Sequence, residues 1–336
     1  MAMHITAIIC TRNRAEQLRR TLESAVAIDI PDGITWELLL VDNGSSDHTP
    51  EVVRSFAAKL PIRHVTEPKA GLSNARNRGV SEARGSHVCW TDDDVLIDSQ
   101  WLAAYADAFA RHPEAAYFGG PIELLLEGPT PSWLVKDRKS LGPILAERLF
   151  GDVPIRLNPA TDLIPYGANY AVRTREQLVH RYDPNLGVSP TQRRLGEETE
   201  LLKQLDEEGC CGWWVPDARV RHIIPPERQT IPYFAEYRRA AGETAAYLAE
   251  RRGGKAMHQS LRLGIWPFRG APVLLWCMMA AHLAAYHLSR TLGRSAASLH
   301  QYLRHAYYEG AITYSRKSSA TGSHQSEAEV PSRRVA

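Results

Sequence analysis

The sequence predicts an α/β protein with a largely parallel β-sheet that helices cover on both faces. Over residues 1–122, short apolar runs rich in β-branched residues alternate with stretches whose apolar residues recur at helical spacing. Strands that alternate with helices of about 10–15 residues form crossover units, which place their strands parallel in one sheet. The 336 residues, 44% of them hydrophobic, are enough to fill the core of such a fold.

Each element is expected where a sequence pattern begins and a turn signal ends it. Residues 4–10 are apolar and β-branched, and Leu18, Leu22 and Val26 share one face of a helix over 14–27. Turn residues and changes of periodicity separate the later elements. Further strands are expected at 36–41, 62–66, 87–91, 167–172, 213–215 and 220–224, and further helices at 49–60, 72–83, 101–111, 197–208 and 230–251.

Polar and charged residues gather where the first four expected strands end, at residues 10–14, 41–44, 66–71 and 91–94. In sheets of this kind, ligands bind beyond the carboxyl ends of the strands. We therefore expect the functional site at this edge of the sheet. Six prolines break any long element over residues 123–165, and a surface excursion of that length is typical of a functional loop.

Three adjacent carboxylates, Asp92, Asp93 and Asp94, follow an apolar strand. They repel one another, which favours a compensating cation such as Mg²⁺ or Mn²⁺. Strand alternation would place Asp92 and Asp94 on one side and Asp93 on the other. The alternative is a solvated turn in which Asp94 caps the following helix.

Other polar residues allow both a structural and a functional interpretation. Asp42 could belong to a turn or bind a ligand, and Arg76 could bind phosphate or be solvated on a helix surface. Glu197 and Glu198 could stabilise a helix N-terminus or supply a general base. The last two residues with open alternatives are His222, as a structural or metal-binding histidine, and Trp213, as core or as a stacking platform.

Composition excludes several classes of protein. Forty basic and 38 acidic residues leave a net charge of +2, so no global basic field would attract nucleic acid. The five cysteines form no Cys-x-x-Cys pair, which argues against a disulfide framework or a structural zinc site. Residues 1–11 lack the order of a secretory signal, and this favours a cytoplasmic protein.

The C-terminal region raises the question of a membrane. Twenty residues between Arg269 and Arg290 carry no formal charge, and as a helix they would span about 30 Å. Their histidines, alanines and flanking arginines favour a helical hairpin lying on a membrane surface over a soluble packing or dimer element, and over a true span. Residues 316–336 are polar and low in complexity and are expected to be disordered.

Taken together and in this order, the motifs resemble those of family 2 glycosyltransferases with a GT-A fold. The matching segments are residues 9–14, 41–47, 71–77, 92–94, 167–169 and 196–198, within a resemblance that covers about residues 4–250. It implies a Rossmann-like nucleotide-diphospho-sugar transferase fold with a C-terminal helical extension. The implied divisions are a nucleotide-sugar-binding half (1–122), an acceptor-binding and catalytic half (123–252), a helical extension (253–315) and the tail (316–336).

The resemblance implies transfer of a sugar from a nucleotide-diphosphate donor, preferably a UDP-sugar, to an acceptor hydroxyl with inversion. The product would be a polysaccharide or lipid-linked glycan, made at the inner face of the cell membrane. The base of the family is usually the Asp of a Gly-Glu-Asp motif, a position that Glu198 occupies here, so Glu198 and Glu197 both stay candidates. The implied donor-binding residues are Thr11, Arg14, Asp42, Arg76, Asp92 and Asp93, the metal ligands Asp94 and His222, and the acceptor-binding residues Gly167, Asn169 and Trp213.

Two other functions compete with this expectation. A nucleotide-sugar-binding scaffold without catalysis would explain the Glu at position 198. A sugar-phosphate nucleotidyltransferase has a similar fold, but it usually carries a glycine-rich loop after the first strand, and residues 11–14 contain no glycine.

Overall fold

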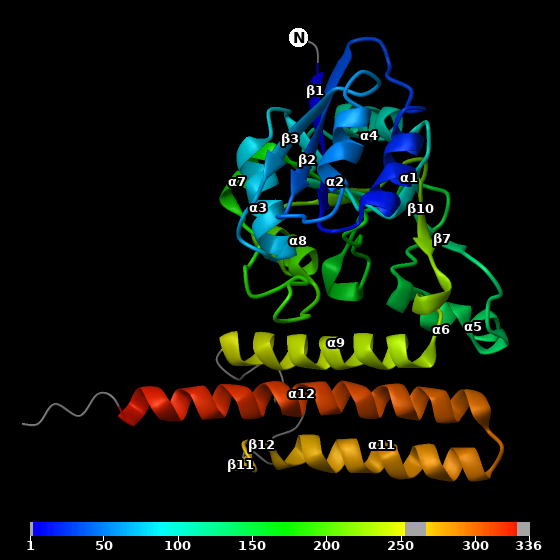
Figure 1. Ribbon diagram of the computed structural model, residues 1–336, viewed down its shortest axis with the longest axis vertical. Coiled ribbons are helices and arrows are strands. Elements are labelled where there is room, and N and C mark those ends of the chain that lie inside the picture. Colours follow the sequence, from blue (N-terminus) through cyan, green and yellow to red (C-terminus); the bar gives the residue numbers. More distant parts are fainter. Residues whose placement is uncertain (1–2, 253–266, 328–336) are drawn as a thin grey trace, which may run out of the picture. The chain divides into compact units, whose positions relative to one another are not determined.

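The computed structural model describes residues 3–252 and 267–327 (Figure 1). The chain divides into two compact units, Met1–Pro226 and Glu227–Ala336. The boundary expected at residue 252 therefore falls inside the second unit, because the helix over Ile231–Arg251 belongs to that unit and not to the first.

A seven-stranded sheet forms the centre of the first unit, and its mostly parallel character confirms the predicted fold class. β8 is antiparallel to both of its neighbours, β4 and β6, and the other pairings are parallel. The strand order β3-β2-β1-β4-β8-β6-β9 joins β3 (Ile62–Thr66), β2 (Ile34–Asp42), β1 (Met3–Thr11), β4 (His87–Thr91), β8 (Asn169–Arg173), β6 (Tyr117–Gly119) and β9 (Gly212–Trp214).

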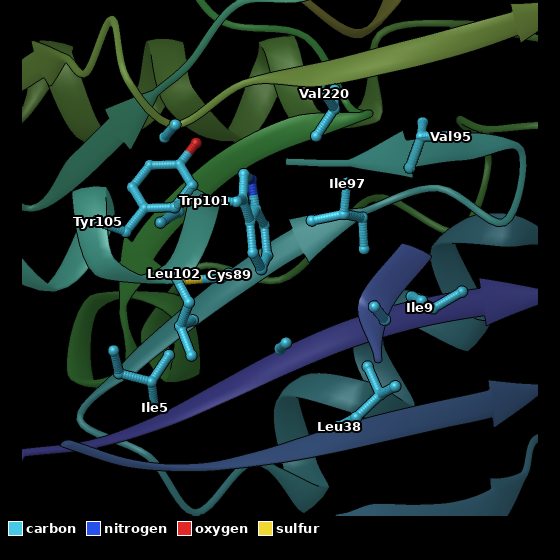
Figure 2. Packing of buried hydrophobic residues seen from close by; sticks show 14 of the residues in the cluster. Ile5, Ile9, Leu38, Cys89, Val95, Ile97, Trp101, Leu102, Tyr105 and Val220 are labelled. Carbon is cyan, nitrogen blue, oxygen red and sulfur yellow. The ribbon is translucent and has the colours of Figure 1, made fainter. Parts of the chain in front are cut away.

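Helices cover both faces of this sheet because its central strands are apolar on both sides. Along β1, Ile5 and Ile9 pack into one core and Ile8 packs into the other. The first core includes residues of α1 (Ala15–Ala25), α2 (Thr49–Ser55) and α4 (Trp101–Arg111), and Figure 2 shows Trp101 and Tyr105 of α4 within it. The second core includes residues of α3 (Leu72–Glu82) and α8 (Glu197–Glu207).

A second sheet of three strands joins the region after the acidic triplet to the excursion. Its order is β5-β10-β7, formed by β5 (Val95–Ile97), β10 (Val220–Ile224) and β7 (Ile122–Leu126). The excursion thus begins within a strand, and it then carries α5 (Ser132–Lys136), α6 (Arg138–Leu141), η1 (Gly142–Leu145) and η2 (Pro159–Thr161). Sequence patterns missed β5, β6, β7 and α7 (Thr174–Val179), all of six residues or fewer.

The second unit contains α9 (Ile231–Arg251), α11 (Val273–Thr291) and α12 (Ser295–Glu327), with α12 lying between the other two (Figure 1). A short hairpin, β11 (Pro267–Phe268) and β12 (Ala271–Pro272), precedes α11. Helices α9 and α12 approach so closely at Gly242 that a Cβ there would lie 1.9 Å from the Tyr307 carbonyl oxygen.

The prediction of disorder from residue 316 is wrong as far as Glu327, where α12 ends. Polar composition does not stop a helix that tertiary packing has already nucleated, since each further residue adds a hydrogen bond at low cost. Residues 328–336 lie outside the described part of the chain.

Candidate functional site

The acidic triplet lies in a turn at the carboxyl end of β4 and not in the strand itself. β4 ends at Thr91, so the predicted alternation is wrong: Asp93 and Asp94 face the same partner, and Asp92 faces another. Arg14, at the start of α1, places Nη1 2.7 Å from Asp93 Oδ1 and Nη2 2.5 Å from Asp94 Oδ2. The guanidinium group therefore compensates two of the three carboxylates.

Asp93, one of the two carboxylates that Arg14 binds, is buried and has a second partner. Thr11, the last residue of β1, donates its hydroxyl to Asp93 Oδ2 at 2.7 Å. Burial raises the pKa of Asp93 to about 7, an effect that Arg14 opposes and Asp94 reinforces. Thr11 and Asp93 thus hold the turn in place, and their predicted contact with a nucleoside stays a prediction.

Asp94, in the turn after β4, and His222, in β10, come together as the predicted metal pair requires. The Leu145 carbonyl lies 2.8 Å from His222 Nδ1, so we assign the ring N–H to Nδ1, where it donates to that carbonyl. In this tautomer Nε2 presents a lone pair 3.4 Å from Asp94 Oδ1. Two acceptors at this distance require a proton or a metal cation between them.

The pair fits a divalent cation that is shared with a diphosphate. Mg²⁺ keeps several waters and takes one or two protein carboxylates besides phosphate oxygens. A metal-binding histidine characteristically donates its other N–H to a backbone carbonyl, as His222 does. Within residues 3–252 and 267–327 no group of three His, Cys, Asp or Glu gathers around a point, so the protein by itself provides no complete cage there.

At the end of β2, Asp42 and Asn43 organise the neighbouring loops. Asp42 Oδ1 accepts the backbone N–H of Ser45 at 2.8 Å, and its Oδ2 lies 3.9 Å from His64 Nε2. Asn43 donates to the carbonyls of Glu67 and Lys69 and accepts from the N–H of Gly71. We did not single out Asn43 from the sequence, although a buried amide beside two loops can bridge both of them.

Arg76 is not the solvated surface residue of the structural interpretation, because its side chain is only 3% exposed. The guanidinium carbon lies 5.6–5.9 Å from the ring centroids of Trp90, Tyr170 and Tyr182. Such rings attract a cation through their negative faces. Arg76 is therefore held in an aromatic cage behind the carboxyl edge of the sheet.

Arg76 connects the acidic triplet with the acids of α8. Its Nη2 lies 3.6 Å from Asp92 Oδ1, and its Nη1 lies 3.0 Å from Glu197 Oε1 and 3.8 Å from Glu198 Oε2. One guanidinium group thus reaches carboxylates from both clusters. The sequence interpretation placed these motifs at one edge but gave no contact between them.

The two glutamates of α8 differ in their surroundings. Glu197 is buried, and burial, reinforced by Glu198 and opposed by Arg76, raises its pKa to about 7. The Glu198 side chain is 13% exposed, and its Oε1 accepts the backbone N–H of Gly167 at 3.2 Å. Gly167 is required at this position because a Cβ would lie 2.7 Å from Arg76 Nη2.

Of the predicted acceptor-binding residues, Asn169 lies beside Thr91 but has its amide fully used, and Trp213 lies away from the acidic edge. The prediction that Asn169 binds the acceptor is wrong, because the residue is fully buried. Its amide N–H groups donate to two backbone carbonyls, and its amide oxygen accepts from Trp101 and Tyr105. Its polar atoms therefore hold the sheets together and leave nothing for an acceptor. Trp213 lies in β9, three strands from β4 or roughly 14 Å at the usual strand spacing, and stacks on His112.

The fold resembles that of solved glycosyltransferases. A mannosyltransferase from Pyrobaculum calidifontis, solved with GDP-Man and Mn²⁺, aligns with a TM-score of 0.53 and 17% identity over 97% of this chain and 76% of its own. GalNAc-T7, solved with UDP, GalNAc and Mn²⁺, aligns with a TM-score of 0.51 and 18% identity over 76% of this chain and 51% of its own.

Sequence comparison gives more specific relatives. The chain is 26% identical to the succinoglycan biosynthesis protein ExoM of Rhizobium meliloti over 258 residues, which are 75% of this chain and 77% of ExoM. It is 34% identical over 99 residues to a cholesterol galactosyltransferase of Borreliella burgdorferi, covering 29% of this chain and 27% of that protein. A poly-beta-1,6-N-acetyl-D-glucosamine synthase of Staphylococcus epidermidis matches at 28% identity over 119 residues, 35% of this chain and 28% of the synthase.

The fold therefore resembles the GT-A fold of these solved glycosyltransferases. Residues 6–137 match the family described as glycosyl transferase family 2, and the relatives above support the same family. The chain is accordingly a transferase, as the resemblance predicted.

Proposed function

We propose that the protein transfers a sugar, with inversion, from a nucleotide-diphosphate donor to an acceptor hydroxyl in polysaccharide or lipid-linked glycan synthesis. A UDP-sugar is the donor we favour. The observation that supports this is the contact of Arg76 with both Asp92 and the glutamates of α8. Donor-binding and base-supplying carboxylates thereby lie within 4 Å of one guanidinium group, close enough to serve a single reaction centre.

In the proposed reaction Glu198 accepts the proton of the acceptor hydroxyl. The hydroxyl oxygen forms a bond to the anomeric carbon, and the bond from that carbon to the diphosphate oxygen breaks with its electron pair on the diphosphate. Glu198 suits this role better than Glu197 because it is more exposed and the Gly167 N–H orients it, whereas Glu197 pairs with Arg76 at 3.0 Å.

Asp94 and His222 would hold the divalent cation, Mn²⁺ or Mg²⁺, together with the diphosphate. When bound, the cation stabilises the negative charge that develops on the leaving diphosphate. Thr11, Arg14, Asp42, Asp92 and Asp93 would surround the nucleoside and its ribose. The excursion over residues 123–165 would exclude water, which favours transfer over hydrolysis.

Metal-dependent thermal stabilisation by UDP-, GDP- and dTDP-sugars, followed by measurement of slow donor hydrolysis, tests the proposal. We expect one nucleotide class to raise the melting temperature only with Mn²⁺ or Mg²⁺ present. Glu198→Gln should lower hydrolysis and transfer by about 10²–10⁴-fold without abolishing donor binding, since the general base is lost. Glu207→Gln, at an exposed position of the same helix, is the matched control and should keep full activity.

Three results would contradict the proposal in different ways. Absence of stabilisation by every nucleotide sugar would remove the donor. Full turnover after thorough chelation, or in Asp94→Ala, would remove the metal. Donor binding without any hydrolysis or transfer in the wild-type protein would support the scaffold instead.

We also propose that the second unit attaches the enzyme to the inner surface of the cell membrane. None of the helices in the described ranges is long and apolar enough to cross a membrane, so the least favoured alternative, a true span, is not found there. Val273, Cys277, Ala284 and Leu288 share an exposed, uncharged face of α11. No acid occurs between Arg269 and Glu309, a charge distribution that suits an anionic lipid surface.

Sedimentation with vesicles tests this attachment. We expect the protein to bind vesicles of anionic lipid at low salt, and Leu288→Glu to lower binding by tenfold or more, about the cost of placing a charge on the inserted face. Val179→Glu, at a position 76% exposed in the first unit, is the control and should bind as the wild type does. If the two variants bind vesicles equally, or if neither the wild type nor the variants bind vesicles, α11 serves soluble packing or a dimer contact instead.

A further inference from the structure

A groove of about 530 Å³ lies along α4 and β9, apart from the acidic edge. None of its lining residues belongs to the acidic triplet, the glutamates of α8 or their arginines. All of the lining lies between Asp98 and Arg219, within the first unit. The groove is therefore a feature of the glycosyltransferase unit that the proposed reaction does not use.

The floor of the groove is apolar and combines small residues with a flat ring. Ala104 and Ala108 of α4 form one part of the lining, and Trp213 and Val215 form another. The Trp213 indole stacks on His112 at 4.0 Å between centroids and donates its N–H to Glu114 at 3.3 Å. These contacts fix the ring, so the floor offers a preorganised amphipathic surface.

The rim of the groove is rich in hydrogen-bonding groups but has no uncompensated positive charge. Arg111 pairs with Asp107 at 2.9 Å, and Arg219 reaches Glu123 at 3.2 Å and Asp152 at 2.8 Å. The exposed rim carboxylates Asp98 and Asp217 are acceptors only. Such a rim disfavours phosphate or nucleic acid and suits a neutral ligand that presents many hydroxyl donors.

The near end of the groove lies close to the proposed metal site. Asp98 follows Asp94 by four residues, so their Cα atoms are at most about 14 Å apart. A chain molecule that occupies the groove could therefore extend to the acidic edge without leaving the surface of this unit.

We infer that the groove binds a neutral saccharide segment of the acceptor or product glycan, beyond the sugar that reacts. The inference rests on the proposed glycosyl transfer, because that reaction brings a glycan to this unit. Apolar sugar faces would lie on Trp213 and the alanines of α4, and sugar hydroxyls would donate to Asp98 and Asp217. Binding of a segment outside the reaction centre would favour longer acceptors over short ones.

Ligand-observed NMR titrations with cellotetraose, maltotetraose and the tetramer of N-acetylglucosamine test the groove. We expect the wild-type protein to bind at least one of these tetrasaccharides. Ala104→Phe, which fills the floor, should weaken that binding by tenfold or more. Ala110→Phe, at an exposed position of the same helix outside the groove, should bind within about twofold of the wild type.

Asp217→Asn provides a second variant that adds no bulk and keeps the fold even where Ala104→Phe does not. It should weaken binding by about fivefold, the difference between a hydrogen bond to a charged acceptor and one to a neutral amide oxygen. Failure of all three tetrasaccharides to bind, or equal affinity in Ala104→Phe and Ala110→Phe, would overturn the groove assignment. A changed oligomeric state in Ala104→Phe without saccharide binding would assign the groove to a protein contact instead.

Nucleotide-sugar turnover by the wild-type protein is measured in parallel, so that the two proposals can fail separately. Turnover without tetrasaccharide binding leaves the transferase and removes the groove. Tetrasaccharide binding that Ala104→Phe abolishes, without any nucleotide-sugar binding or turnover, leaves a saccharide-binding groove and removes the proposed reaction.

Discussion

Two arginines compensate the carboxylates of this enzyme, and they do so in different environments. Arg14 faces Asp93 and Asp94 with a side chain that is 31% exposed, at the start of a helix. Arg76 faces Glu197, Glu198 and Asp92 with a side chain that is 3% exposed, within a cage of three aromatic rings. The first cation lies where solvent and ligands can reach it, and the second does not.

This difference assigns different roles to two similar clusters. An exposed guanidinium can rearrange when a metal ion takes over the compensation of charge, as a donor-binding cluster requires. A buried guanidinium cannot move away without leaving its carboxylate partners uncompensated in the low-dielectric interior, which is unfavourable. We therefore expect the Arg14 cluster to respond to divalent cations and the Arg76 cluster to act as a fixed support for the base.

Removal of Arg76 should produce the largest change in stability. Arg76→Met leaves buried carboxylates without their cation, which costs about 3–5 kcal/mol in the free energy of unfolding. Urea denaturation measures this loss. Arg76→Met with Glu197→Gln should recover part of it, because the unpaired charge is removed; no recovery would show that Arg76 stabilises the fold through its aromatic contacts alone.

Arg14→Met should destabilise the protein less, by about 1.5–3 kcal/mol, the scale of hydrogen bonds to charged groups. Millimolar Mn²⁺ should restore much of this stability in thermal melts, since a cation can compensate Asp94 from solvent. Arg111→Met removes an exposed pair with Asp107 and should show neither effect. If Mn²⁺ raises the melting temperatures of all three proteins equally, the exchangeability of Arg14 is disproved.

Gly167→Ala tests the support of the base directly. The added methyl would lie 2.7 Å from Arg76 Nη2, and overpacking of this kind costs about 1–3 kcal/mol. We expect kcat to fall more than the donor KM rises, because a shift of the Arg76 guanidinium disturbs the glutamates of α8, one of which is the proposed base. Gly209→Ala, where a Cβ meets nothing within 4 Å but φ is +85°, controls for the loss of a glycine in the same unit.

The pH dependence of stability is the most gradual of the expected effects, because it is spread over the range between two pKa values. The pKa of Glu197 is raised in the folded protein from its ordinary value of 4.5 to about 7, chiefly by burial. Between these two values the Glu197 carboxyl binds more protons in the folded state than in the unfolded state, so its contribution to stability is largest below pH 4.5 and falls as the pH rises to 7.

The slope from this group approaches about 1.4 kcal/mol per pH unit in the middle of that range. Urea denaturation of the wild type and Glu197→Gln at several pH values measures it. Glu197→Gln should show a shallower decline, and parallel curves for the two proteins would contradict the raised pKa.

Much of the first unit could be predicted because its elements carry their own periodicity. The strands at Ile62–Thr66, His87–Thr91 and Val220–Ile224 and the helix at Trp101–Arg111 have the predicted bounds. The three-residue strands β5 and β6 were not found, and the equally short β9 was expected one residue late, since a run of that length carries little pattern and its bounds are set by pairing. Helix α2 ends at Ser55, five residues before the expected end, because a turn follows.

The candidate site was predictable in its location but not in its contacts. Each strand end ran into polar residues, and parallel strands bring those ends to one edge. Asn169 misled the interpretation because its local sequence resembles a site motif, whereas its amide is fully used by Pro121, Ala218, Trp101 and Tyr105 from distant segments.

By itself the sequence determined the alternation of strands and helices, the edge at which the acids gather and the family whose motifs they resemble, since all three follow from local order along the chain. Tertiary structure decided which cation each acid meets. Arg14 and Arg76 are both arginines near a helix start, and only long-range packing exposes one and encloses the other. The reason is physical: burial and charge compensation depend on what surrounds a group in space, and neighbours in space are set by the whole fold.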